Sequence, residues 1–223
     1  MQAAPLHLDT PPWHLSGTVL GALLNDPAAL AALGDALHQP PHKAPPRAPV
    51  LEVKPRHTWA TDGDAIAVPG AVLVGVSLAI VLGHGAHRVQ ASDALALVAG
   101  WLVAGDLSLP LPGHYRPSVR LKARDGFCPL GQVLVPAAAV PQPDALATQV
   151  LVDGVCVQRA STAGRQRGVA QLIADVSQFM TLQPGDVLLL GATHGAPLVL
   201  PGQAVQLLID SVGTLGFTLV AEA

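Results

Sequence analysis

The sequence predicts a β-rich α+β fold, and two observations lead to that class. Short apolar segments rich in Val, Leu and Ile recur along the chain, and Pro-Gly or Asp-Gly turns separate many of them, a pattern typical of strands. Only about three segments carry helix-start signals, and they do not alternate with the strands as in a repeating βαβ fold. We therefore expect sheets of short strands with few helices.

The first 49 residues are expected to form a small strand-helix unit with a connector. Residues 16–24 predict a strand. Asp26 and Pro27 then favour a helix start, as N-cap and first helical residue, with apolar residues continuing to Leu37. The proline-rich stretch 39–49 must be extended, because proline fixes its own φ and restricts the residue before it. It would connect this unit to a main domain of residues 50–223.

The main domain is expected to be a series of strands with two helices. Residues 92–103 predict a helix capped by Ser92-Asp93, and residues 169–180 an amphipathic helix. Asp153-Gly154 is a two-residue hairpin signal between residues 148–152 and 155–158. The remaining expected strands are 50–53, two within 65–82 on either side of Pro69-Gly70, 107–109, 187–190, 204–209 and 216–220.

Charged residues make up only 12% of the chain, against about 25% in ordinary domains. A net charge of −3 gives no electrostatic basis for binding nucleic acid. The scarcity of charge leaves two explanations: a membrane span, or surface buried against a partner. Residues 65–83 are uncharged, but the turn at Pro69-Gly70 and the β-branched residues after it favour two strands over one spanning helix. We therefore expect no membrane span and a homodimer or heteromer.

The cysteines and the first residues indicate a cytoplasmic protein. Cys128 and Cys156 have neither zinc-site spacing nor the number that a disulfide framework needs, so both are expected to be reduced. Residues 1–10 lack the basic segment and apolar core of a signal peptide.

A basic segment at residues 114–131 is the most informative part of the sequence. It is irregular and contains four of the chain's twelve Lys and Arg residues: Arg116, Arg120, Lys122 and Arg124. Arginines bind carboxylates through paired hydrogen bonds, so the segment could hold a small anionic substrate. A solvated basic loop with one structural pair, such as Arg124–Asp125, explains the composition equally.

The same segment reads YRPSVRLKARDGFCPLG from Tyr115 to Gly131, and it resembles a signature of the fumarylacetoacetate hydrolase family. Other family-like segments follow the family order: Lys54–Thr58 (KPRHT), Val74–Gly83, Val98–Ser108, Phe179–Asp186 (FMTLQPGD) and Pro201-Gly202. The resemblance runs from about Ser16 to the C-terminus. It implies the family's mixed β-sheet/β-roll fold.

Within the family, the sequence is most similar to the first half, or first subunit, of isomerase/decarboxylases of 4-hydroxyphenylacetate (homoprotocatechuate) breakdown. That type carries a Y-K-A-P-P motif, which reads His42–Arg47 (HKAPPR) here. The resemblance implies decarboxylation of 5-oxopent-3-ene-1,2,5-tricarboxylate and isomerisation of 2-hydroxyhepta-2,4-diene-1,7-dioate. It also implies Mg²⁺ or Mn²⁺, a Lewis acid that stabilises the enolate.

The chain departs from the family pattern at the metal site. The two Glu positions of the family's E-x-E motif are Gly75 and Ser77 here, which leaves Asp106 as a vestigial ligand. One carboxylate and a hydroxyl make a poor Mg²⁺ site. The other site residues that the resemblance implies are Lys122, as the catalytic lysine that polarises the substrate, and Arg116, Arg124 and Tyr115, as substrate contacts.

The family's proton-transfer pair is also missing. Its His and Glu positions are Ala29 and Ala32, and its G-T-P loop reads Gly191-Ala192-Thr193. These losses predict a supporting subunit with a degenerate metal site, which acts with a metal-bearing second subunit and is not by itself a competent metal-dependent catalyst. Two alternatives stay open: a non-catalytic binding or scaffold protein on a dead enzyme fold, and a metal-free tautomerase that uses Lys122 as acid and base.

Overall fold

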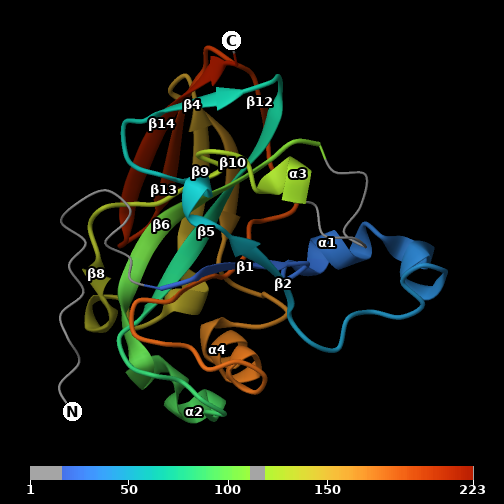
Figure 1. Cartoon of the computed structure of the whole chain (residues 1–223), viewed down its shortest axis with the longest axis vertical. Helices are drawn as coiled ribbons and strands as arrows, with labels where there is room; N and C mark the ends of the chain where they lie inside the picture. Colours follow the sequence, from blue (N-terminus) through green and yellow to red (C-terminus); the bar gives the residue numbers. More distant parts are fainter. Residues whose placement is uncertain (1–16, 111–118, 223) are drawn as a thin grey trace.

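The computed structural model describes residues 17–110 and 119–222, and their strands form two large sheets and one two-stranded sheet (Figure 1). The larger sheet has the order β2-β1-β11-β5-β6-β8, and β12 pairs with β5 beside that path. Its strands are β1 (Val19–Leu23), β2 (Val50–Lys54), β5 (Val72–Leu82), β6 (Val98–Ser108), β8 (Val135–Pro136), β11 (Val187–Leu189) and β12 (Leu198–Val199).

The second sheet has the order β10-β9-β13-β14-β4 and packs against β5 and β6. Its strands are β4 (Ala65–Val68), β9 (Ala147–Val152), β10 (Val155–Ser161), β13 (Ala204–Ile209) and β14 (Gly213–Ala221). The third sheet pairs β3 (Trp59–Ala60) with β7 (Cys128–Pro129).

Four α-helical segments occur in the described ranges, and each is short. They are α1 (Pro27–Ala31), α2 (Ala91–Ala94), α3 (Val119–Lys122) and α4 (Val169–Ser177), with 3-10 helices at Gly34–His38, Arg56–Thr58, Leu95–Leu97, Ala137–Ala139 and Pro143–Ala145. Helices α2 and α4 contact each other at one end of the molecule (Figure 1). Among the described residues, no helix has both the length and the apolar character that crossing a membrane requires.

The long strands β5 and β6 divide the core in two, because successive side chains of a strand point to opposite faces. One face carries Val74, Val76 and Leu78 of β5 and joins the main core, which α4 and the second sheet complete. The opposite face carries Ala79 and Val81 and joins a smaller cluster with Val19, Leu102, Ala104, Cys128, Leu130, Val187 and Leu189. Positions 75, 77 and 106 belong to this second face, and Gly75 pairs directly with Asp106.

The main strand predictions are confirmed. Pro69-Gly70 separates β4 from β5, and the hairpin of β9 and β10 turns at Asp153 and Gly154, both of which have positive φ. Residues 204–209 form β13, and the last strand is longer than expected at Gly213–Ala221. The fold is β-rich α+β, as the sequence predicts.

The helix predicted for residues 92–103 is wrong. Only Ala91–Ala94 is α-helical, a 3-10 turn follows, and β6 begins at Val98. Strand pairing along the whole of β5 outweighs the local helix-start signal, since the apolar side chains of Val98, Trp101 and Val103 are then buried in the core. Helix α1 is also shorter than predicted and ends at Ala31.

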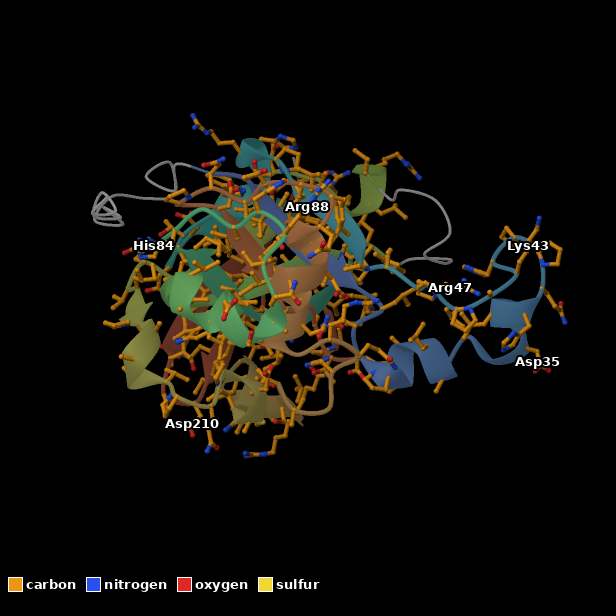
Figure 2. The ribbon with its side chains drawn as sticks, turned by 90° about the horizontal axis from the view of Figure 1, so that it is seen from below. Asp35, Lys43, Arg47, His84, Arg88 and Asp210 are labelled. Carbon is orange, nitrogen blue, oxygen red and sulfur yellow. The ribbon has the colours of Figure 1, made fainter. Side chains whose placement is uncertain are left out.

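The N-terminal segment contributes both a core strand and a projecting arm. Strand β1 lies inside the larger sheet, parallel to β11 and antiparallel to β2. The chain that follows α1 leaves the body of the molecule, and Figure 2 shows Asp35 and Lys43 at its far end. Of the first 49 residues, the described part, 17–49, is thus built partly into the larger sheet, between β2 and β11.

Candidate functional site

A cleft of about 360 Å³ opens where the ends of β1, β5 and β6 meet two loops. Its apolar lining includes Leu23, Leu24 and Leu73, and its polar lining includes Asp106, Lys122 and Thr193. The remaining lining residues are Ala22, Ala29, Ser108, Ala192, His194, Gly195 and Ala196. The cleft therefore combines an apolar wall with a few charged and polar groups, which is typical of small-molecule sites.

Four charged side chains form an ion-pair cluster at this cleft: Glu52, Lys54, Asp106 and Lys122. Asp106 Oδ1 accepts a hydrogen bond from Lys54 Nζ at 2.6 Å and one from Lys122 Nζ at 2.8 Å. Glu52 Oε1 lies 2.9 Å from Lys54 Nζ and 3.4 Å from Lys122 Nζ. One aspartate oxygen thus holds both ammonium groups.

The curvature of the larger sheet brings these residues together. Glu52 and Lys54 are two apart on β2, so both point to the face that also carries Asp106 on β6. Three strands separate β2 from β6 in the sheet order, yet the Lys54 and Asp106 side chains touch. The sheet must therefore curl, with this face on its concave side. Lys122 arrives from α3.

The pKa values of Asp106, Lys54 and Glu52 depend on burial and on the charges of their neighbours in the cluster. Burial alone raises the pKa of Asp106, but the Lys122 and Lys54 charges outweigh it and hold that pKa well below its usual range. Burial alone lowers the pKa of Lys54, but Asp106 and Glu52 raise it above its ordinary value. Burial and the Asp106 charge raise the pKa of Glu52. Asp106 is therefore the firmly ionised partner of a lysine that stays charged.

A second polar network fixes the wall of the cleft through Asp26. Its Oδ2 accepts from the His194 backbone N–H at 2.8 Å, and its Oδ1 caps α1 by accepting from Ala28 N–H at 2.9 Å. Arg165 Nη1 lies 3.2 Å from the same carboxylate, and Arg165 Nη2 donates to Thr193 Oγ1 at 2.8 Å. Burial lowers the pKa of Arg165, and the negative charge of Asp26 partly offsets this decrease.

Asn25 and Ser77 hold the start of the same loop. The Asn25 amide donates to Leu190 O at 2.8 Å, and its oxygen accepts from Arg167 N–H at 2.9 Å. Ser77 Oγ accepts from Gly191 N–H at 3.0 Å. Gly191 has a φ of +101°, which disfavours side chains, and a Cβ there would meet Ala22 O at 2.6 Å. Residues 191–195 are therefore held in one position over β5.

The residues present do not fit the divalent cation that the family resemblance implies. A Cβ at Gly75 would lie 2.4 Å from Ala192 Cβ, so the loop fills the place where a glutamate ligand would begin. The Ser77 hydroxyl already accepts a hydrogen bond from Gly191 N–H of the loop, and Asp106 Oδ1 already accepts hydrogen bonds from Lys54 and Lys122. In the described part of the chain, no group of three or more His, Cys, Asp and Glu residues could hold a metal.

The structure brings some of the sequence-predicted site residues together and separates others. Lys122 and Asp106 meet in the ion-pair cluster. Arg124 pairs instead with Glu222, lies 5.9 Å from the Phe127 ring centroid, and does not line the cleft. Arg116 and Tyr115 lie outside the described residues.

Sequence reasoning missed Glu52 and Lys54 as site residues. A signal was available, because two charged residues at positions i and i+2 of an otherwise apolar strand point to the same side. It also missed the Asp26–Arg165 pair. Those residues are 139 positions apart, and nothing in their local sequence marks them as partners.

Residues 18–220 match the family model described as fumarylacetoacetate (FAA) hydrolase C-terminal. The chain is 36% identical over 210 residues to the 4-hydroxyphenylacetate degradation bifunctional isomerase/decarboxylase of Escherichia coli, covering 93% of this chain and 48% of the relative. The chain thus spans about half the length of the curated relatives it matches with highest coverage.

Solved structures agree with the family match. The 5-carboxymethyl-2-hydroxymuconate delta-isomerase of Mycobacterium smegmatis has a TM-score of 0.76 and 27% identity, covering 93% of this chain and 80% of that one. Maleylpyruvate hydrolase from Sphingobium, in complex with manganese(II) ion and pyruvate, has a TM-score of 0.75 and 25% identity, covering 92% and 71%. Since the family model matches nearly the whole chain, the chain belongs to the fumarylacetoacetate hydrolase family.

Proposed function

We propose that this chain is the supporting subunit of an isomerase/decarboxylase of homoprotocatechuate catabolism. Its substrates would be those of the related enzymes: 5-oxopent-3-ene-1,2,5-tricarboxylate for decarboxylation and 2-hydroxyhepta-2,4-diene-1,7-dioate for isomerisation. The observation that carries the proposal is a preserved cleft with Lys122 and Asp106 in its lining but with Gly75 and Ser77 at the two family Glu positions. A cytoplasmic location and a division at residue 49 remain predictions from the sequence.

The proposed site residues are Lys122 as the group that touches substrate and Asp106 as the group that positions it. Lys122 reaches the cleft and is held by Asp106 at 2.8 Å. Arg116 and Tyr115 are proposed as further substrate contacts on the family resemblance alone. Arg124 would have to leave Glu222 to contact a ligand, so its proposed role as a substrate contact requires that pair to open.

The chain's own chemistry is limited to binding and orienting a small anionic substrate. Ala29 lines the cleft and Ala32 follows the end of α1, and neither can transfer a proton. We therefore propose that proton transfer and metal chemistry reside in a second, metal-bearing subunit. The relatives it matches with highest coverage, which are about twice as long, are consistent with a partner of similar size.

The proposal is tested by assaying both reactions with the purified chain alone and mixed with a metal-bearing paralogue. Little activity alone and full activity in the mixture is the expected outcome. Full activity of the chain alone would contradict the supporting role. Size-exclusion chromatography of the mixture checks that a heteromer forms.

A second candidate function is a non-catalytic binding or scaffold protein. It is favoured by Ala29, Ala32, Gly75 and Ser77, which stand where the family resemblance implies proton-transfer and metal-binding residues. Tight, Mg²⁺-dependent binding of oxalate in calorimetry would contradict it. A third candidate is metal-free tautomerisation with Lys122 as acid and base. A Lys122→Ala variant that keeps the isomerase rate would rule that candidate out.

A further inference from the structure

We infer that the cleft binds a small carboxylate-bearing anion without any divalent cation, with the Lys54 and Lys122 ammonium groups supplying the positive charge of the site. The inference rests on the proposed function, because it assumes that the cleft takes a small organic acid. It goes beyond the proposed function by stating which groups of this chain hold the ligand in place of a metal ion.

The first step is that the space for metal ligands is filled. Ala192 sits where the first atom of a side chain at position 75 would lie, with 2.4 Å between the two Cβ positions. That loop is held in place by Ser77, Asn25 and Asp26, through hydrogen bonds of 2.8 to 3.0 Å. The loop that contains Ala192 therefore occupies the space that a metal-binding carboxylate side chain at position 75 would need.

The second step is that the remaining carboxylate is already neutralised. Lys54 is 1% exposed, and its ammonium lies 2.6 Å from Asp106 Oδ1. Lys122 is paired with the same oxygen, so Asp106 already holds two ammonium groups. A divalent cation placed on Asp106 would add two positive charges beside two buried ammonium groups, and their repulsion in a site of low dielectric constant is strong.

The third step is that Lys122 has donors to spare. An ammonium group has three N–H donors, and Asp106 accepts one of them. Glu52 lies 3.4 Å away and has no hydrogen bond of acceptable geometry at its Oε1. Lys122 lines the cleft, so a remaining donor can serve a carboxylate there. Lys54 is too buried to touch the ligand. Because its charge also balances that of Asp106, the charge of Lys122 remains available to the ligand.

The fourth step concerns Thr193, another polar residue that lines the cleft. Thr193 Oγ1 accepts from Arg165 Nη2, which leaves the hydroxyl proton for an acceptor in the cleft. The lining also includes the apolar side chains of Leu23, Leu24 and Leu73. Apolar walls exclude water and strengthen a charge-assisted hydrogen bond. The ligand that fits this arrangement is a short organic acid whose carboxylate meets Lys122.

The experiment is calorimetric titration of the full chain with oxalate, once in EDTA and once in Mg²⁺. We expect the same affinity in both. We expect Lys122→Met to weaken binding by at least about tenfold, the usual effect of losing a hydrogen bond between charged groups. The matched control is Lys43→Met, which removes a charge at the far end of the projecting arm (Figure 2). Lys43 does not line the cleft, so this variant should bind oxalate as the unaltered chain does.

The outcomes separate this inference from the proposed function. Oxalate binding that requires Mg²⁺ overturns the inference, and the activity assay with and without the metal-bearing paralogue then decides separately whether the chain is a supporting subunit. Absence of binding in both buffers overturns both. Unchanged affinity in Lys122→Met overturns the inference. Should that variant not fold, Mn²⁺ titration of the unaltered chain followed by electron paramagnetic resonance decides: we expect no bound Mn²⁺, and stoichiometric binding would overturn the inference.

Discussion

Lys54 of β2 donates a 2.6 Å hydrogen bond to Asp106 of β6 across the concave face of a curved sheet. Lys122 shares the same acceptor atom, so the two ammonium groups depend on one carboxylate oxygen. This shared dependence gives Asp106 a larger role in stability than any single exposed ion pair would have.

Replacing Asp106 by Asn should lower the free energy of unfolding by about 3 kcal/mol at pH 7, because it leaves buried ammonium groups without their main partner. Urea denaturation measures the change. The matched control is Glu52→Gln, which should have a much smaller effect, since burial already raises the pKa of Glu52 and disfavours its charged form. Equal losses in the two variants would contradict the central role of Asp106.

The stabilising contribution of Asp106 should vanish in acid. Its pKa is lowered in the folded state, so its stabilisation is fully present above the unfolded value of about 4 and is lost as the pH falls below it. The difference in unfolding free energy between the unaltered chain and Asp106→Asn should therefore shrink between pH 6 and pH 3. Glu52 has the opposite sign: its pKa is raised, so Glu52→Gln should gain relative stability as the pH rises above about 4.5. If the difference in unfolding free energy between the unaltered chain and Asp106→Asn did not change with pH, Asp106 would not be the ionised partner of the two lysines.

Gly75→Ala should destabilise the chain by about 1–3 kcal/mol, the usual cost of overpacking, because the new methyl group would collide with Ala192. Adding Ala192→Gly should recover much of that loss, since it removes the colliding atom. A double-mutant cycle with the four variants measures the coupling. Additive effects would show that the loop does not fill the space over Gly75.

Arg165→Met should loosen the cleft wall and cost about 2 kcal/mol of stability, because Asp26 and Thr193 lose a buried charged partner. Hydrogen exchange of residues 191–195 should become faster than in the unaltered chain. Arg56→Met serves as control, since Arg56 is exposed, and should leave exchange in that loop unchanged. Unaltered exchange in Arg165→Met would show that Arg165 does not hold the loop.

The two cysteines should differ sharply toward a thiol reagent. Cys128 is fully buried, and burial raises its pKa to about 12, whereas Cys156 is half-buried on the edge strand β10. Since the thiolate is the reactive form, we expect Cys156 alone to react quickly in native buffer and both to react in urea. Cys156→Ser should abolish the fast phase. A fast phase that survives in that variant would contradict the burial of Cys128.

The sequence predicts the strands where apolar residues and turn signals agree, as at Pro69-Gly70 and Asp153-Gly154. It fails at residues 98–103, because the helix start at Ser92-Asp93 is local whereas the pairing of β6 with β5 is not. The candidate site shows the same limit. Lys122 and Asp106 follow from the family resemblance. Lys54 meets them only because the sheet is curved, and the curvature of a sheet depends on the pairing of several strands, so no single segment of the sequence predicts it.

The long separation of the contacts around Asn25 and Asp26 bears on how the protein folds. Asn25 bonds to Leu190 and Asp26 to His194, which are 165 and 168 residues further along the chain. All four members of the ion-pair cluster precede residue 123, but β11 (Val187–Leu189) lies between β1 and β5 in the sheet, so Lys54 meets Asp106 only after β11 has been added. Contacts of such sequence separation form slowly. The charged cluster and the wall of the cleft should therefore both appear late in refolding, when β11 and the loop after it join the sheet.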